Sequence, residues 1–181
     1  MKGDPHGFDK FVDLQESSRV LIDEVMRHVS GHNAPILDLG CNVGRHLSAL
    51  HKLGFTNLYG VDVQREAIDR MREVFPDMCK VSHVERATFQ DYLPKTASGF
   101  FEVVFTHGAT VELVPPSFPI CWHMARAASR AVVLLINESG HAFPRLWETE
   151  FKRAGFLLTK LLRPVVPGEM HSLLVFEPIT L

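Results

Sequence analysis

The chain has 181 residues, of which 46% are hydrophobic and 22% charged, proportions typical of one globular domain. A formal net charge of −2, without a local basic patch, argues against nucleic acid as a partner. No apolar run reaches the roughly 18 residues of a membrane span and no signal-peptide pattern follows the first Met, so we expect a cytoplasmic protein without a membrane partner.

A helix is predicted before the first strand. Its apolar side chains recur at helical spacing along one stripe: Val20, Leu21, Val25, Met26 and Val29. Ser17 or Ser18 is expected to cap its start and Gly31 to close it.

Two strand-helix units follow. Residues 35–39 form a short apolar run, and residues 58–63 form a second run that ends around Asp62. The apolar positions of the two helices are Val43, Leu47 and Leu50 before Gly54, and Ala67, Ile68, Met71 and Val74 before Pro76. Two such units in succession predict parallel strands joined by right-handed crossovers.

The remaining elements complete an α/β pattern. Strands are predicted at residues 81–89, 101–106 and 131–136, and helices at residues 118–129 and 144–154, the second with Pro144 in its first turn and Gly155 at its end. Residues 156–163 and 171–177 are two more strands, whose link is too short for a crossover helix, so they should pair antiparallel. We therefore predict a doubly wound, mostly parallel seven-stranded sheet with an antiparallel last strand and helices on both faces.

The main motif is Asp38-Leu39-Gly40-Cys41-Asn42-Val43-Gly44, which lies where the first strand ends and a helix begins. Ligands of open α/β sheets bind at such ends, and free N–H groups there are suited to a carboxylate. The dehydrogenase pattern G-x-G-x-x-G fails at Asn42 and Arg45. The pattern acidic-x-G-x-G-x-G departs only at Asn42, and Asn is among the non-glycine residues that best tolerate a left-handed backbone.

Residues 36–44, Ile36-Leu37-Asp38-Leu39-Gly40-Cys41-Asn42-Val43-Gly44, resemble the first motif of class I S-adenosylmethionine-dependent methyltransferases, and the resemblance extends over most of the chain. It implies S-adenosylmethionine as cofactor. The implied donor-binding residues are Asp38, Gly40, Cys41, Asn42 and Gly44 for the methionine part, Asp62 for the ribose hydroxyls, Val63 and Gln64 beside the adenine, and Gln90 and Asp91 for the adenine amino group.

Each of these residues has a structural alternative. Asp38 and Asp62 are also suited to cap the helices that follow them, and the glycines to allow close packing. The joint spacing of two acidic strand ends around a glycine turn favours the ligand interpretation.

The acceptor side is predicted after the fourth strand, in residues 105–116, where the family places residues that face the reacting methyl group. His107 is a candidate general base that also contacts the donor, and Glu112 is a second choice. A hydrogen-bonded wall residue is the alternative for His107. The ten histidines and the carboxylates show no metal-ligand spacing, and the three cysteines no C-x-x-C pair, so no metal is expected.

The acceptor class is narrowed by absent motifs. The fourth strand is not followed by the Asn/Asp-Pro-Pro-Tyr/Phe motif of enzymes that methylate planar nitrogens, and no proline precedes Cys121 as in cytosine-ring methyltransferases. The Phe-Thr-His-Gly stretch resembles small-molecule methyltransferases of sugar and secondary-metabolite pathways. We expect a small-molecule acceptor, with oxygen favoured slightly over nitrogen; a non-catalytic donor-binding or partner-regulating module and a nicotinamide-dependent reductase are the alternatives.

The resemblance also divides the single predicted domain, residues 1–181, into three parts. These are a helical segment (1–33), a donor-binding half (34–92) and an acceptor-side half (93–181). Residues 8–11 and 137–143 are the material expected to cover the acceptor pocket, whereas Trp147 and Phe151 are expected in the core.

Overall fold

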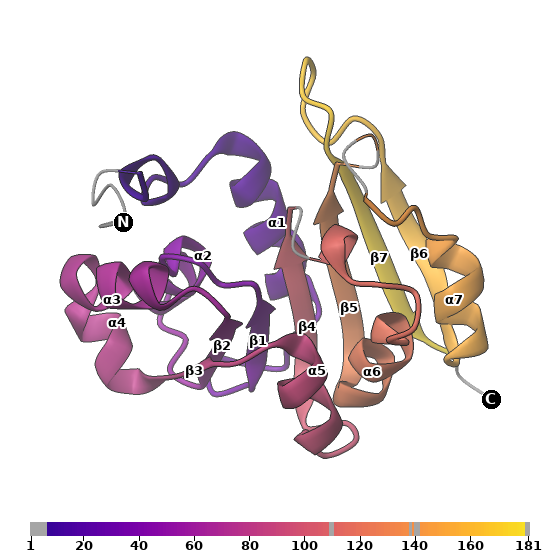
Figure 1. Cartoon of the computed structure of the whole chain (residues 1–181), viewed down its shortest axis with the longest axis horizontal. Helices are drawn as coiled ribbons and strands as arrows, with labels where there is room; N and C mark the ends of the chain where they lie inside the picture. The colour runs from indigo at the N-terminus through magenta and orange to yellow at the C-terminus, as the bar shows by residue number, and fades with distance from the viewer. Residues whose placement is uncertain (1–6, 109–110, 138, 140–141, 180–181) are drawn as a thin grey trace.

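The computed structural model describes residues 7–108, 111–137, 139 and 142–179 (Figure 1). Seven strands form one sheet in the order β3-β2-β1-β4-β5-β7-β6. Their bounds are β1 (Ile36–Leu39), β2 (Leu58–Asp62), β3 (Ser82–Arg86), β4 (Phe101–His107), β5 (Ala128–Ile136), β6 (Phe156–Leu162) and β7 (Ser172–Pro178). Strands β1 to β5 pair in parallel, and β7 runs antiparallel to both β5 and β6, which confirms the predicted sheet.

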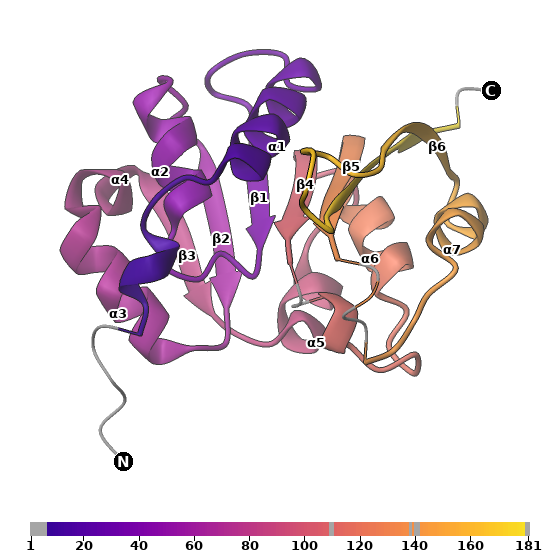
Figure 2. The ribbon, with the colours of Figure 1, turned by 90° about the horizontal axis from the view of Figure 1, so that it is seen from above.

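The described helices lie on both faces of this sheet. They are α1 (Glu16–Arg27), α2 (Arg45–Lys52), α3 (Arg65–Val74), α4 (Pro76–Val81), α5 (Phe89–Tyr92), α6 (Ile120–Ala127) and α7 (Trp147–Arg153), with 3-10 turns η1 (Asp9–Phe11), η2 (Leu93–Lys95) and η3 (Val111–Leu113). Figure 2 shows α1 on one side of β4 and β5, and α5 and α6 on the other.

Two separate cores result from the alternation of side chains along the strands. In β5, Val132 and Leu134 pack in the core that includes α6 and α7, whereas Val133 and Leu135 pack in the core that includes α1 and α2. Trp147 and Phe151 are buried in the first of these cores, as predicted. The chain therefore buries both faces of its central strands, as a doubly wound fold requires.

The start and the end of α1 differ from the prediction. Its N-cap is Gln15, in an extended conformation, and Ser17 and Ser18 lie inside the helix with fully buried side chains. The C-cap is His28, so Gly31 lies beyond the helix. Sequence favoured a serine cap because hydroxyls commonly serve there, but packing against the sheet turns both hydroxyls inward.

Three other helix or strand boundaries also differ from the prediction. Pro76 not only follows α3 but also begins α4, where its missing N–H costs nothing. Strand β3 ends at Arg86, and Phe89 belongs to α5. Pro144 is not in a first helical turn, because α7 begins at Trp147. The buried Arg145 donates to Glu150 and to the carbonyl of Val114, and these bonds hold the preceding residues in a loop.

Gly60 lies in a crowded part of β2. A Cβ at this position would lie 2.9 Å from both Cys41 Sγ and Leu47 Cδ1, whereas a Cβ at Gly31 would meet nothing within 4 Å. Neither backbone has a positive φ. Alanine substitutions at these two glycines therefore differ in steric crowding and not in backbone strain.

We predict that Gly60→Ala lowers the free energy of unfolding by about 1–3 kcal/mol through overpacking. Urea denaturation of the purified protein measures this loss. Gly31→Ala serves as the matched control and should not be destabilised. Equal stability of the two variants would contradict the packing described here.

Candidate functional site

The turn after β1 has the backbone that its sequence predicts. Gly40, Asn42 and Gly44 have φ values of 78°, 49° and 77°, so Asn42 adopts the left-handed conformation expected of it. Its side-chain Oδ1 accepts a hydrogen bond from Val43 N at 2.8 Å, which supports that conformation locally. A side chain at Gly44 would collide with Met71, because its Cβ would lie 2.8 Å from Cγ of that residue.

The N–H groups of this turn are already paired within the protein. Gly40 and Cys41 donate to Val61 O at 2.8 and 3.1 Å, Asn42 to Asp62 Oδ2 at 2.8 Å, Val43 to the Asn42 side chain, and Gly44 to Cys41 O at 2.8 Å. The turn therefore shapes the site without offering these amides to a ligand. The first N–H groups of α2, which a helix leaves without intrahelical acceptors, remain for an anion.

Asp62 is the carboxylate that joins the two strand ends. Its side chain accepts from Asn42 N through Oδ2 and from Gln64 N through Oδ1, both at 2.8 Å. Asp62 is nearly buried, and α3 begins beyond it with Gln64 as N-cap and no side-chain cap. Each carboxylate oxygen retains further acceptor capacity for a ligand.

A pocket of about 400 Å³ lies at the carboxyl ends of β1, β2 and β4. Its lining combines the glycine turn, Asp62 and the residues after it, the end of β4, and single residues from distant segments: Gly40, Cys41, Asn42, Val43, Arg45, His46, Asp62, Val63, Gln64, His107, Gly108, Phe11, Gln15, Leu113 and His171. The predicted covering segment at residues 8–11 thus contributes Phe11. In the other predicted segment, residues 138, 140 and 141 lie outside the described residues.

A neighbouring, mostly apolar pocket of about 230 Å³ shares Asp62, Val63 and Leu113 with the first and adds the start of α5. Gln90 lines this pocket. Asp91 does not: its backbone N–H donates to Thr88 Oγ1, and its carboxylate accepts from the same hydroxyl. Asp91 is therefore occupied as the capping partner of α5.

Asp38 lies behind the glycine turn and does not line the pocket. It is completely buried; its Oδ2 accepts from His46 Nδ1 at 3.3 Å, and its Oδ1 has no hydrogen-bond partner among the described residues. His46 Nε2 in turn lies 3.3 Å from Ser18 Oγ and from His107 Nδ1. Asp38 thus reaches the pocket through His46.

His107 ends β4 beside a basic neighbour. Its Nδ1 lies 3.1 Å from Arg45 Nη2 and 3.3 Å from Ser18 Oγ. A guanidinium only donates, so Nδ1 accepts, and the neutral ring carries its proton on Nε2. Burial, together with the neighbouring His46, Arg45 and His171, lowers the pKa of His107 to about 2. The side chain of Glu112 lies outside the described residues.

Sequence reasoning missed four side chains of this site. Ser18 was assigned to a cap, Arg45 and His46 follow the motif in α2, and His171 precedes β7, where its ring contacts that of His107 at 5.2 Å between centroids. The position of Arg45 and His46 beside the motif was an available signal. No local pattern marks Ser18 or His171, because tertiary packing alone brings them to β4.

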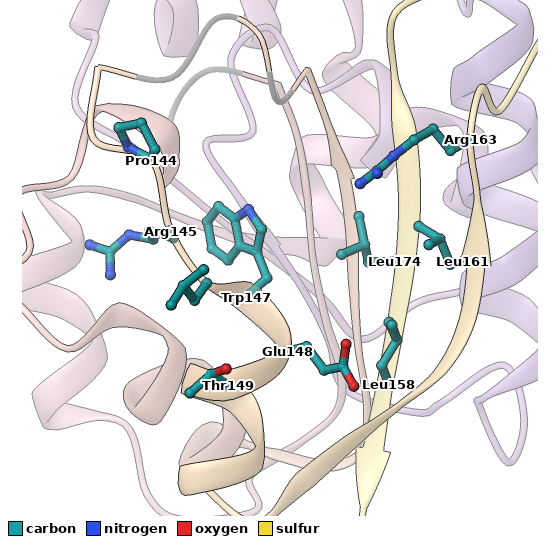
Figure 3. A pocket seen from close by; sticks show the side chains of 10 residues that line it. Pro144, Arg145, Trp147, Glu148, Thr149, Leu158, Leu161, Arg163 and Leu174 are labelled. Atoms are coloured by element: carbon teal, nitrogen blue, oxygen red, sulfur yellow. The ribbon is translucent and has the colours of Figure 1, made fainter.

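A further hollow of about 550 Å³ lies between α7 and β6 (Figure 3). Trp147, Leu158 and Leu174 are among its lining residues, and none of the predicted site residues is. Within the described ranges, no group of three or more His, Cys, Asp or Glu is placed to hold a metal ion. None of the described helices has the length and apolar character needed to cross a membrane.

We predict that His107 stays neutral in the folded protein down to pH 5. The ring of His107 stays unprotonated in the folded protein, whereas the unfolded chain binds a proton as pH falls below 6.5. The contribution of His107 to stability is therefore complete above pH 6.5 and decreases below that value. Between pH 7 and pH 5, wild type should lose about 2 kcal/mol more stability than His107→Gln.

Urea unfolding at the two pH values measures this difference, and NMR of the imidazole carbons follows the protonation directly. A His107 resonance that titrates above pH 5 would contradict the prediction.

The comparisons with known proteins agree with this fold. A family model described as a methyltransferase domain matches residues 36–131, which is more than half of the chain. No curated protein sequence matches the chain.

Several solved structures share the fold at low sequence identity. A TehB-like S-adenosylmethionine-dependent methyltransferase from Corynebacterium glutamicum is 19% identical, with a TM-score of 0.72 over 92% of this chain and 89% of that one. Magnesium protoporphyrin IX methyltransferase from Synechocystis, with bound S-adenosylmethionine, is 13% identical, with a TM-score of 0.73 over 99% and 86%. A methyltransferase from Haloferax volcanii, in complex with the Trm112 activator, is 14% identical, with a TM-score of 0.72 over 98% and 94%.

The matched segment runs from the start of β1 into β5 and so includes the glycine turn, Asp62 and His107. The chain therefore belongs to the methyltransferase-domain family, as a class I S-adenosylmethionine-dependent methyltransferase.

Proposed function

We propose that this protein transfers a methyl group from S-adenosylmethionine to a small-molecule acceptor in the pocket at the carboxyl ends of β1, β2 and β4. The observation that carries the proposal is the buried carboxylate of Asp62, held by two backbone amides at the junction of a polar and an apolar pocket. A ribose with two adjacent hydroxyls fits this carboxylate, because the carboxylate only accepts and the diol offers two donors.

The residues around Asp62 suit the rest of the donor. The apolar pocket with Val63 and Gln90 matches the adenine, and Gln90 offers its amide to the ring edge. The turn of Gly40, Cys41, Asn42 and Gly44 borders the polar pocket and would hold the methionine part through its shape and carbonyls, since its amides are paired. Asp38 does not line the pocket, so it would influence the methionine part indirectly, by orienting His46 through their hydrogen bond.

When bound, S-adenosylmethionine supplies an electrophilic methyl group, so the protein has mainly to align the acceptor and, for a hydroxyl, to remove a proton. We propose His107 for that role, with Glu112 as second candidate. His107 is neutral and lines the pocket. The pKa of about 2 makes the ring a weak base in this arrangement, and its lone pair on Nδ1 faces Arg45, so proton acceptance requires the Arg45 contact to open.

The acceptor proposed here is a small molecule of the sugar or secondary-metabolite kind, methylated on oxygen. Support comes from the size of the pocket, which is typical of small-molecule sites. The name of the similar Synechocystis enzyme also specifies a small acceptor, magnesium protoporphyrin IX. Donor binding without turnover on any acceptor would favour the alternative of a non-catalytic module.

We predict that Asp62→Asn weakens the binding of S-adenosylhomocysteine by about 1–3 kcal/mol, roughly five- to 150-fold in Kd, through lost charged hydrogen bonds. Titration calorimetry measures the affinity. Asp69→Asn makes the same change on the exposed face of α3 and should bind like wild type. An Asp62→Asn protein that folds and binds with wild-type affinity would refute the ribose assignment.

We predict that His107→Gln lowers kcat on a hydroxyl acceptor by about a hundredfold or more, the usual contribution of a general base. The affinity for S-adenosylhomocysteine should change far less. The measurement is single-turnover methylation over a panel of hydroxyl compounds. Undiminished turnover would show that the base lies elsewhere or is not needed.

A further inference from the structure

In the described part of the chain, Arg45 has no carboxylate partner at the end of the pocket. It is half-buried as the first residue of α2, and its one described side-chain hydrogen bond goes to the neutral ring of His107. Its Nη1 is covered by protein and has no hydrogen-bond partner among the residues that the structure describes. Burying an unpaired charge is costly, and no carboxylate of the described residues forms an ion pair with Arg45.

Other arginines of the described chain are satisfied in ordinary ways. Ion pairs with Asp or Glu are formed by Arg27, Arg65, Arg70, Arg72, Arg130 and Arg145. Arg126 donates to the carbonyls of Leu93 and Thr96. Arg45 differs from all of these in facing a pocket without either kind of partner in the part of the chain described.

Arg45, His107 and His171 line one end of the pocket, which we call the corner. The described carboxylates near this corner already have other partners. Asp38 raises the pKa of Arg45 through space, but burial outweighs this effect and holds that pKa below its usual value. Asp38 is bonded to His46, and Asp62 to the backbone amides of the glycine turn and Gln64. Glu169 lies 3.1 Å from Nδ1 of His171 through its Oε2 and is paired with that ring.

We propose that Arg45, together with His107 and His171, forms a carboxylate-binding subsite that holds the methyl acceptor. The guanidinium supplies the charge, and Nε2–H of His107, which makes no described hydrogen bond, supplies a neutral donor. The acceptor class is therefore a small carboxylic acid. This inference rests on the proposed function, because it places the acceptor in the same pocket.

Two molecules could supply the carboxylate: the acceptor, or the amino-acid tail of the donor. The position of the corner favours the acceptor. His107 ends β4 and His171 precedes β7, so the corner extends from the glycine turn toward the β5 side of the sheet. The tail of the donor has another partner, the first N–H groups of α2.

The first arm of the test measures carboxylate binding to protein saturated with S-adenosylhomocysteine. Acetate and benzoate are titrated calorimetrically at constant ionic strength, against acetamide and benzamide as uncharged counterparts. We expect wild type to bind a carboxylate and not its amide. Arg45→Gln should weaken this binding by about tenfold or more, and Arg45→Lys should recover part of it. Arg72→Gln, an exposed control on α3, should bind like wild type.

The second arm separates the two sources of carboxylate. S-adenosylhomocysteine carries the amino-acid tail and 5′-methylthioadenosine lacks it. We expect Arg45→Gln to leave the ratio of their affinities unchanged. A fall of about tenfold in that ratio would assign Arg45 to the donor and overturn the acceptor subsite.

Failure of the two proposals is distinguishable. If wild type binds neither adenosyl compound, the proposed function fails, and carboxylate titration of the donor-free protein still tests the subsite. If donor binding is normal but no carboxylate binds, or Arg45→Gln binds carboxylates as wild type does, the subsite is refuted alone. Thermal unfolding of each variant confirms that it is folded.

Discussion

The pair of hydrogen bonds from Asn42 N and Gln64 N to the Asp62 carboxylate organises the site. They join the turn after β1 to the turn after β2, two segments that parallel pairing already brings to one edge of the sheet. With the turn amides of residues 40, 41, 43 and 44 paired elsewhere in the protein, the backbone is rigid before any ligand arrives. Preorganisation of this kind reduces the cost of ordering the site on binding.

At the opposite end of the pocket, burial and the charges of neighbouring side chains are the dominant effects. Arg45 and His46 each lie within hydrogen-bond distance of His107, and burial with like-signed neighbours holds the pKa of His107 near 2. The methyltransferase therefore keeps its histidine neutral and its arginine charged. A carboxylate entering this corner would offset the charge of Arg45 and draw the guanidinium from Nδ1 of His107. In the proposed mechanism, acceptor binding would therefore free the lone pair of Nδ1.

The limits of sequence reasoning are visible at particular residues. Asn42 was correctly assigned a left-handed backbone, because that preference depends on the residue and its two neighbouring glycines. The turn amides were expected to meet a carboxylate, but Val61, Asp62 and Cys41 occupy most of them. Ser17 or Ser18 was expected to cap a helix, but Gln15 is the N-cap and both serines are buried in the first turn of α1. The errors concern contacts between elements, which residue spacing does not specify.

The amino-acid sequence by itself determined the alternation of strands and helices, the antiparallel last strand, and the placement of Asp38 and Asp62 at neighbouring strand ends. These features follow from periodicity, turn residues and short links, all of which are local. Only the tertiary structure decided that Ser18, Arg45, His46 and His171 surround His107. These side chains come from α1, α2 and the link before β7, and they meet because the sheet places β4 between β1 and β5 and the helices pack across it.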